Sequence, residues 1–278
     1  LPIYVPDYAV VAGNPARVLR LGSVPSWRWW RDLENRSGVH VMHLSNAPFP
    51  GLARYQGIAV QPLALLEQVS LPHASTEGAI ASHRASVHDR LAHLIETHPL
   101  SEPAWMRHLG AVIPATARVF LGNSLPIREW NLAGTCPAVA FANRGANGID
   151  GLVSTFYGLG VGAEESWLVI GDLSALYDLS APWIAAQLPP GRRRIAIINN
   201  GGGKIFSRVE SLRSLDPPAR QVIENRHALS FEPWAQLWGL PYRRVTQPAH
   251  LHDLPSSDLI MEIRPDDDQT EAFWGGWR

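Results

Sequence analysis

Short apolar runs separated by turn residues organise the chain, and from residue 103 onward they alternate with helical patterns. Strands are predicted in ARVFLGNS, PAVAFANRG, SWLVIGD, RRIAIINN and SDLIMEIRP. Helices are predicted in WMRHLGAVIP, PIREWNLAG, LVSTFYGLGVGA, SALYDLSAPWIAAQL and HALSFEPWAQLWGL. Runs such as WLVIG are apolar throughout, which indicates a sheet covered on both faces. The alternation predicts an α/β fold with a doubly wound parallel sheet.

The first part of the chain has a shorter version of the same pattern. Strands are predicted in ARVLRLGS, GVHVMHLS and YQGIAVQ, and a helix in PSWRWWRDLENRSG between the first two. The polar stretch SLPHASTEGA predicts a linker. We therefore expect part of a smaller α/β domain at 1–72 and a larger domain at 73–278.

A histidine-rich helix is expected after the linker. Its histidines are five residues apart, so they spiral around the helix and cannot share one face as metal ligands. They are His83, His88, His93 and His98. We expect them to be ordinary surface residues.

Composition excludes several classes of partner. The chain has 278 residues, 46% of them hydrophobic, and a formal charge of −1, which gives no reason to expect nucleic acid. No apolar run reaches the roughly 18 to 20 residues that span a bilayer, so no stable membrane insertion is expected. The single cysteine, Cys136, suits a reducing compartment, and we expect a cytoplasmic protein. Trp27, Trp29 and Trp30 are expected in a core or an interface.

Four predicted strands end in polar or glycine-rich sequence. These ends are at Ser124, at Asn143-Arg144, at Asp172 and at Asn199-Asn200. In open α/β sheets, ligands bind beyond the carboxyl ends of the strands, so these residues should line one rim.

The rim offers oxygen ligands for a metal ion. Asp172 supplies a carboxylate, Asn200 an amide oxygen and Gly202 a backbone carbonyl, a set that suits Mg²⁺ completed by phosphate oxygens. Helix N-termini after Gly171 and Gly145 would add N–H groups for a diphosphate. The alternative for Gly-Asp is a turn with a helix cap, and for NNGGG a simple loop. A nucleotide-binding GxGxxG fingerprint directly after a strand is absent.

The spacing of Gly-Asp and Asn-Asn resembles the thiamine-diphosphate signature. In order and spacing, GNSLPIR, NRGANGIDG, GDLSALYDL and NNGGGKIF resemble the C-terminal half of the menaquinone-pathway synthase family MenD. The resemblance covers roughly residues 10 to 278. It implies a thiamine-diphosphate-binding fold, with thiamine diphosphate and Mg²⁺ as cofactors and Mn²⁺ as a possible substitute.

Site roles follow by matching each motif to the family. The resemblance implies Asp172, Asn200 and the carbonyl of Gly202 as metal ligands. It implies that Ile149 is the apolar residue that packs against the cofactor and holds it in a bent conformation. The expected cofactor contacts are Ser124, Gly148, Ile149, Gly171, Ser174, Ile205 and Phe206. The residues expected to face substrate are Ser124, Arg128, Arg144 and, in a looser match, Arg28; Arg128, Arg144 and Ile149 are the expected catalytic residues.

The implied chemistry suits these residue types. The family decarboxylates 2-oxoglutarate and adds the resulting succinyl carbanion to isochorismate. Both substrates carry two carboxylates, which the planar guanidinium of arginine binds bidentately. The alternative for Arg128 and Arg144 is an ion pair on a helix surface, and for Ser124 a helix cap.

Some features depart from the family. Gly201 stands where the family often has a polar residue, and Asn147 replaces a smaller one. The family also needs a pyrimidine-binding domain that carries a catalytic glutamate and that a second subunit supplies in the homodimer or homotetramer. Nothing in this sequence resembles that domain. The chain is therefore expected to be about half a synthase and to be inactive alone. The chain does not begin with methionine, which suggests a trimmed or processed chain.

Two alternatives to this function stay open. The chain could belong to another thiamine-diphosphate enzyme acting on a 2-oxo acid, or it could be a non-catalytic diphosphate-binding or assembly module.

Overall fold

The computed structural model describes residues 17–21, 24, 30, 33–44, 51–52, 60–61, 77–143, 148–209, 212 and 214–277. The chain divides into two compact units, 1–92 and 93–278, and each is described by itself. The division falls within helix α2 (Glu77–Thr97). The domain boundary expected at residues 72–73 lies outside the described residues and stays a prediction.

The first unit contains a three-stranded parallel sheet in the order β1-β2-β3. Its elements are β1 (Arg17–Leu21), the 3-10 helix η2 (Leu33–Asn35), β2 (His40–Leu44) and β3 (Val60–Gln61). The three strands coincide with those predicted. Of the three clustered tryptophans, Trp30 is described, and it packs in a small core with Leu33, Val41 and Leu52.

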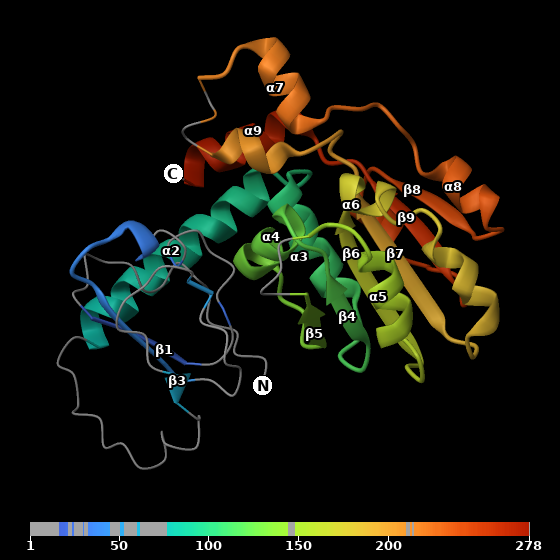
Figure 1. Ribbon diagram of the computed structural model, residues 1–278, viewed down its shortest axis with the longest axis horizontal. Coiled ribbons are helices and arrows are strands. Elements are labelled where there is room, and N and C mark those ends of the chain that lie inside the picture. Colours follow the sequence, from blue (N-terminus) through green and yellow to red (C-terminus); the bar gives the residue numbers. More distant parts are fainter. Residues whose placement is uncertain are drawn as a thin grey trace. The chain divides into compact units, whose positions relative to one another are not determined.

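The second unit is a six-stranded parallel sheet in the order β5-β4-β6-β7-β9-β8, with helices on both faces (Figure 1). Its strands are β4 (Arg118–Leu121), β5 (Val139–Ala142), β6 (Glu165–Gly171), β7 (Arg192–Ile198), β8 (Tyr242–Val245) and β9 (Leu259–Ile263). Its α-helices are α3 (Glu102–Val112), α4 (Leu125–Ala133), α5 (Leu152–Leu159), α6 (Asp172–Leu176), α7 (Pro217–Glu224), α8 (Glu232–Leu237) and α9 (Asp267–Trp277). Its 3-10 helices are η4 (Ala181–Gln187), η5 (Lys204–Arg208) and η7 (Pro248–Leu251). The predicted doubly wound α/β fold is confirmed.

The central strands are buried on both faces, which explains their unbroken apolar runs. In β6, Leu168 and Ile170 point to the face where Phe156 of α5 and Trp234 of α8 complete the core. Trp167 and Val169, which alternate with them along the strand, are buried on the opposite face. There α3 packs against α4, and α4 packs against β6.

The order of the strands gives the sheet a topological switch point between β4 and β6. From β4 the chain moves outward to β5 on one side, and the later strands follow on the other side of β4. Ligands in open α/β sheets bind at such a switch point, beyond the carboxyl ends of the strands. The segments that leave this edge begin at Gly122 after β4 and at Asp172 after β6.

Two predicted helices are much shorter than expected. The stretch 174–188 is divided between α6 and η4, because Pro182 has no N–H to continue the hydrogen-bonding pattern. The stretch 227–240 is helical in α8 alone, since the N–H of Phe231 instead donates to the carboxylate of Glu262. None of the helices described has both the length and the apolar composition needed to cross a membrane.

Candidate functional site

Asp172 lies at the carboxyl end of β6, where the strand passes directly into α6, and it is buried. Its Oδ1 accepts a hydrogen bond from the N–H of Leu173 at 2.6 Å. Its Oδ2 accepts bonds from the N–H groups of Gly201 and Gly202 at 2.8 and 2.9 Å. The carboxylate therefore joins the end of β6 to the glycine turn that follows β7.

The surroundings of Asp172 leave its negative charge only partly compensated. Burial raises the pKa of the carboxyl group, and the N–H of Leu173 and the neighbouring His227 oppose this rise. Nε2 of His227 lies 3.3 Å from Oδ2 of Asp172, while Nδ1 accepts a bond from the N–H of Leu229. A bound cation would offset the remaining cost of burying the charge.

Asn200 follows β7 and presents an amide oxygen to the same rim. Its Nδ2 donates to Oε1 of Glu102 at 2.8 Å. Its Oδ1 is buried and has no hydrogen-bond partner among the residues that the structure describes. A buried acceptor without a donor is costly unless a ligand satisfies it. Asn200 Oδ1 is thus an atom that favours a bound ligand at this edge.

Gly202 completes the turn in a conformation that favours glycine. Its φ is +138°, and a Cβ atom here would lie 2.6 Å from the carbonyl oxygen of Glu224. Its own carbonyl accepts a hydrogen bond from the N–H of Lys204 at 2.9 Å, which leaves one lone pair for another partner. The glycine turn therefore permits a close approach that a side chain would block.

The donor set suits a hard cation. Asp172, Asn200 and Gly202 contribute a carboxylate, an amide oxygen and a backbone carbonyl, as Mg²⁺ prefers. In the described part of the chain, no group of three His, Cys, Asp or Glu side chains is placed to hold a metal ion. The buried Oδ1 of Asn200 fits this oxygen-only set. The assignment of these three residues to a metal stays a prediction.

Ser124 and Arg128 lie at the start of α4, the helix that follows β4. Ser124 occupies the N-cap position with a φ of 75°, yet its hydroxyl makes no capping hydrogen bond. A positive φ is uncommon for a residue with a side chain and often marks a functional site. Arg128 donates from Nη1 to the Ser124 carbonyl oxygen at 2.7 Å. Substrate contact remains a prediction for both residues.

Asn123 was not predicted, although it helps to hold a predicted residue in place. Its Nδ2 donates to the carbonyl oxygen of Gly148 at 2.7 Å, which fixes the peptide group leading into Ile149. Ile149 is thereby held close to the carboxyl end of β4. No local pattern could have shown this contact, because its partner is a loop carbonyl 25 residues away.

The remaining expected residues fall into two groups. Gly171 ends β6, Ser174 is buried in α6, and Ile205 and Phe206 lie in η5, with Phe206 exposed. These positions lie in the segments that leave the carboxyl ends of β6 and β7, and their cofactor contacts stay predictions. Arg28, Arg144 and Asn147 lie outside the described residues.

Two buried glutamates, one of which contacts Asn200, were also not predicted from the sequence. Glu102 is the first residue of α3 and Glu129 lies in α4, and both are buried. Burial raises the pKa of Glu102, and burial together with the charge of Glu102 raises the pKa of Glu129 well above its usual range. Arg208 opposes both shifts. In the sequence, Glu102 resembled an ordinary acidic residue in the first turn of a helix.

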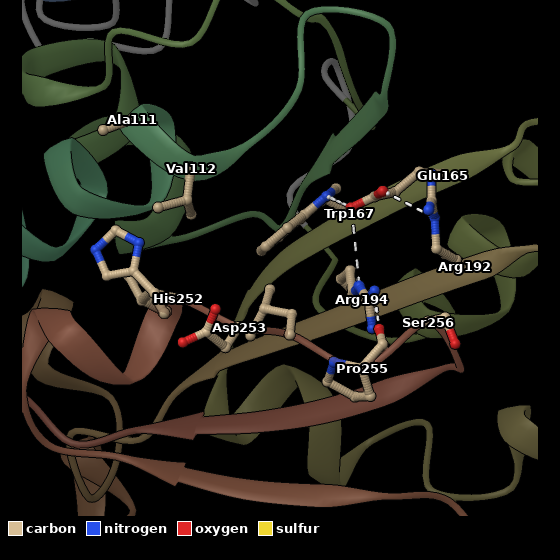
Figure 2. Close-up of a pocket in the computed structure, with 12 residues that line it drawn as sticks. Ala111, Val112, Glu165, Trp167, Arg192, Arg194, His252, Asp253, Pro255 and Ser256 are labelled. Carbon is tan, nitrogen blue, oxygen red and sulfur yellow. Dashed lines mark hydrogen bonds and ion pairs between the residues drawn. The ribbon is translucent and has the colours of Figure 1, made fainter.

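A cavity of about 470 Å³ lies at the opposite edge of the sheet, where β6 and β7 begin (Figure 2). Its two arginines are already paired: Arg192 contacts Glu165 at 3.1 Å, and Arg194 donates to the carbonyl oxygen of Ser257 at 2.6 Å. The N–H of Trp167 also donates to Glu165, at 2.8 Å. This cavity is separate from the Asp172 rim. Because its arginines already have partners within the protein, they do not indicate which ligand the cavity would bind.

The chain matches known synthases over nearly all of its length. It is 37% identical over 267 residues to the 2-succinyl-5-enolpyruvyl-6-hydroxy-3-cyclohexene-1-carboxylate synthase of Bdellovibrio bacteriovorus, covering 92% of this chain and 48% of that protein. The synthase of the same name from Akkermansia muciniphila is 36% identical over 269 residues, covering 93% of this chain and 50% of that protein. The chain thus spans about half the length of the curated relatives it matches. No protein-family model matches the chain.

A solved structure shows the same fold. The thiamine diphosphate-dependent 4-hydroxybenzoylformate decarboxylase of Rhodococcus jostii RHA1 is similar to this chain with a TM-score of 0.52 and 18% sequence identity. The match covers 84% of this chain and 45% of that chain. At this identity the likeness concerns the fold alone.

Proposed function

We propose that this chain, a relative of the 2-succinyl-5-enolpyruvyl-6-hydroxy-3-cyclohexene-1-carboxylate synthases over 92% of its length, forms the metal- and diphosphate-binding part of a thiamine-diphosphate-dependent carboligase. One observation carries the proposal: Asp172 is hydrogen-bonded to the turn at Gly202, next to the buried Oδ1 of Asn200, for which the described part of the chain offers no donor. This is an oxygen-lined rim at the switch point of the sheet, where an α/β fold binds its ligand.

The proposed roles follow from the chain's own atoms. Asp172, Asn200 and the Gly202 carbonyl would hold Mg²⁺ or Mn²⁺, which in turn binds the diphosphate. When bound, thiamine diphosphate supplies the carbon nucleophile for decarboxylation and carbon–carbon bond formation. Ile149, kept in place by the bond from Asn123 to Gly148, would pack against the cofactor. Ile205 and Phe206 would provide apolar contacts beside it.

Substrate recognition would fall to basic and hydroxyl groups of the chain. We assign 2-oxoglutarate and isochorismate as substrates, with Arg128 and Arg144 binding carboxylates and Ser124 contacting substrate. Arg28 is a further candidate of the same kind. Guanidinium groups are suited to this because their parallel N–H donors match the two oxygens of a carboxylate.

A complete site would need more than this chain. The proposal includes a pyrimidine-binding half that carries a catalytic glutamate, contributed by a second subunit of a homodimer or homotetramer. This chain by itself would then bind metal and diphosphate without turning over substrate. A cytoplasmic location belongs to the same proposal.

The test is an activity assay of the protein that contains this chain together with a pyrimidine-binding half. We expect magnesium-dependent release of CO₂ from 2-oxoglutarate and consumption of isochorismate in equal amounts. Turnover of a different 2-oxo acid, without use of isochorismate, would point to another enzyme of the thiamine-diphosphate class. Magnesium-dependent cofactor binding without any turnover would indicate a non-catalytic module.

A further inference from the structure

Glu102 makes a direct contact with a predicted metal ligand, although nothing in its local sequence sets it apart. Its Oε1 accepts the 2.8 Å hydrogen bond from Nδ2 of Asn200, across 98 residues of chain. Glu102 is only 2% exposed, so water does not compete for this bond. The contact therefore links the start of α3 directly to the rim.

The backbone around Glu102 is held from a third segment of the chain. The N–H of Glu102 donates to Oγ1 of Thr270 at 3.1 Å, and the N–H of Leu100 donates to Oε1 of Gln269 at 2.9 Å. Thr270 and Gln269 belong to α9. The carboxyl group is thus presented to Asn200 from a fixed position, which a surface glutamate could not achieve.

The bond determines which way the Asn200 amide faces. A carboxylate oxygen only accepts hydrogen bonds, and Asn200 has one NH₂ group and one carbonyl oxygen. Rotating the amide by half a turn would place Oδ1 against Oε1 of Glu102, two acceptors in contact. With Nδ2 on Glu102, Oδ1 faces the other way and has no donor among the described residues.

We propose that Glu102 is a positioning residue for the metal site: it holds the Asn200 amide with its oxygen directed to the cation. The inference rests on the proposed function and deepens it. Groups that orient a metal ligand in this way typically change metal affinity about 10- to 100-fold when they are removed. The bond needs Oε1 to be the acceptor, a condition that is met by an ionised carboxylate and by a carboxyl group whose proton lies on Oε2.

The test measures Mn²⁺ affinity in the presence of thiamine diphosphate, from the electron paramagnetic resonance signal of free Mn²⁺. For Glu102→Met, which has similar size but no acceptor, we expect about 10- to 100-fold weaker Mn²⁺ binding. For Glu102→Gln we expect a smaller loss, because its amide oxygen can accept the same bond. The control is Asp258→Ala, which removes a carboxylate that pairs with Arg193 and should leave Mn²⁺ affinity unchanged.

A double-mutant cycle separates positioning from a general structural effect. In an Asn200→Ala background, Glu102→Gln should cause no further loss of Mn²⁺ affinity, because the amide on which it acts is gone. Wild-type affinity in folded Glu102→Met, equal losses in Glu102→Met and Asp258→Ala, or additive losses in the cycle would each overturn the proposal. If the wild-type protein binds no Mn²⁺ with the cofactor, the proposed function itself fails, and this inference fails with it.

Discussion

The backbone N–H of Gly202 donates a 2.9 Å hydrogen bond to Oδ2 of Asp172, although the two residues are 30 positions apart in the chain. The contact joins the segments that follow two neighbouring strands, β6 and β7. It places the carboxylate, the Asn200 amide and the Gly202 peptide group at one edge of the sheet. The proposed metal site depends on this hydrogen bond.

Replacing Gly202 by alanine tests whether the turn tolerates a side chain. The added Cβ would lie 2.6 Å from the Glu224 carbonyl oxygen, at a φ of +138°. We expect Gly202→Ala to lower the free energy of unfolding by about 2–4 kcal/mol and to abolish Mg²⁺-dependent cofactor binding. Urea denaturation and calorimetric titration measure the two effects.

Gly158→Ala is the matched control for that substitution. Gly158 lies in α5 and a Cβ there meets nothing within 4 Å. We expect it to raise stability by about 0.5–1 kcal/mol, since alanine favours a helix over glycine. Equal stability of the two variants would show that the tight turn does not constrain residue 202.

Arg128 is predicted to act on substrate rather than on cofactor. Arg128→Ala should raise KM for 2-oxoglutarate or isochorismate by at least about tenfold, through loss of a charge-assisted hydrogen bond. The Kd of thiamine diphosphate should stay nearly constant. Steady-state kinetics of the complete enzyme, with a parallel cofactor titration, measure both. Because Arg128 also donates to the Ser124 carbonyl, a proportional rise in both constants would assign it a structural role instead.

The buried glutamate pair predicts a specific dependence of stability on pH. The pKa of Glu129 is raised well above 4.5 in the folded protein by burial and by Glu102. A carboxyl group with a raised folded pKa contributes its full stability below pH 4.5 and loses it as the pH rises through the folded pKa. Glu129→Gln does not titrate, so the variant should gain stability relative to wild type as the pH rises.

Thermal unfolding of both proteins between pH 4 and pH 8 would measure this difference, which amounts to about 1.4 kcal/mol for each unit by which the pKa is raised. Glu129→Gln also changes the side chain with which Glu102 interacts, so the difference between the two proteins reports the titration of the pair. Parallel curves for Glu129→Gln and wild type would contradict the assigned shift.

The parts of the fold that were predictable are those whose burial leaves a periodic or continuous apolar pattern. β6 and β9 are buried almost throughout and were predicted from sequence. β8 was missed because it is an edge strand in which Arg243 and Arg244 replace the apolar run. The helices α7 and α9 were also missed.

The rim was partly predictable for a related reason. Parallel strands bring their carboxyl ends to one edge, so the approach of the Asn200 segment to Asp172 follows from the order of strands and helices. Glu102 and His227 reach the same place from a helix and a loop whose sequences carry no such regularity. Their contacts depend on tertiary packing, and a single sequence does not reveal that.

The most direct test of the account is a calorimetric titration of thiamine diphosphate into the protein, with Mg²⁺ and with a chelator, for wild type and Asp172→Ala. Asp258→Ala is the control, since it removes a carboxylate that pairs with Arg193 instead. We expect saturable binding that requires Mg²⁺ in wild type and Asp258→Ala, and no binding in a folded Asp172→Ala protein. Unchanged Mg²⁺-dependent binding in Asp172→Ala would contradict the proposed metal site.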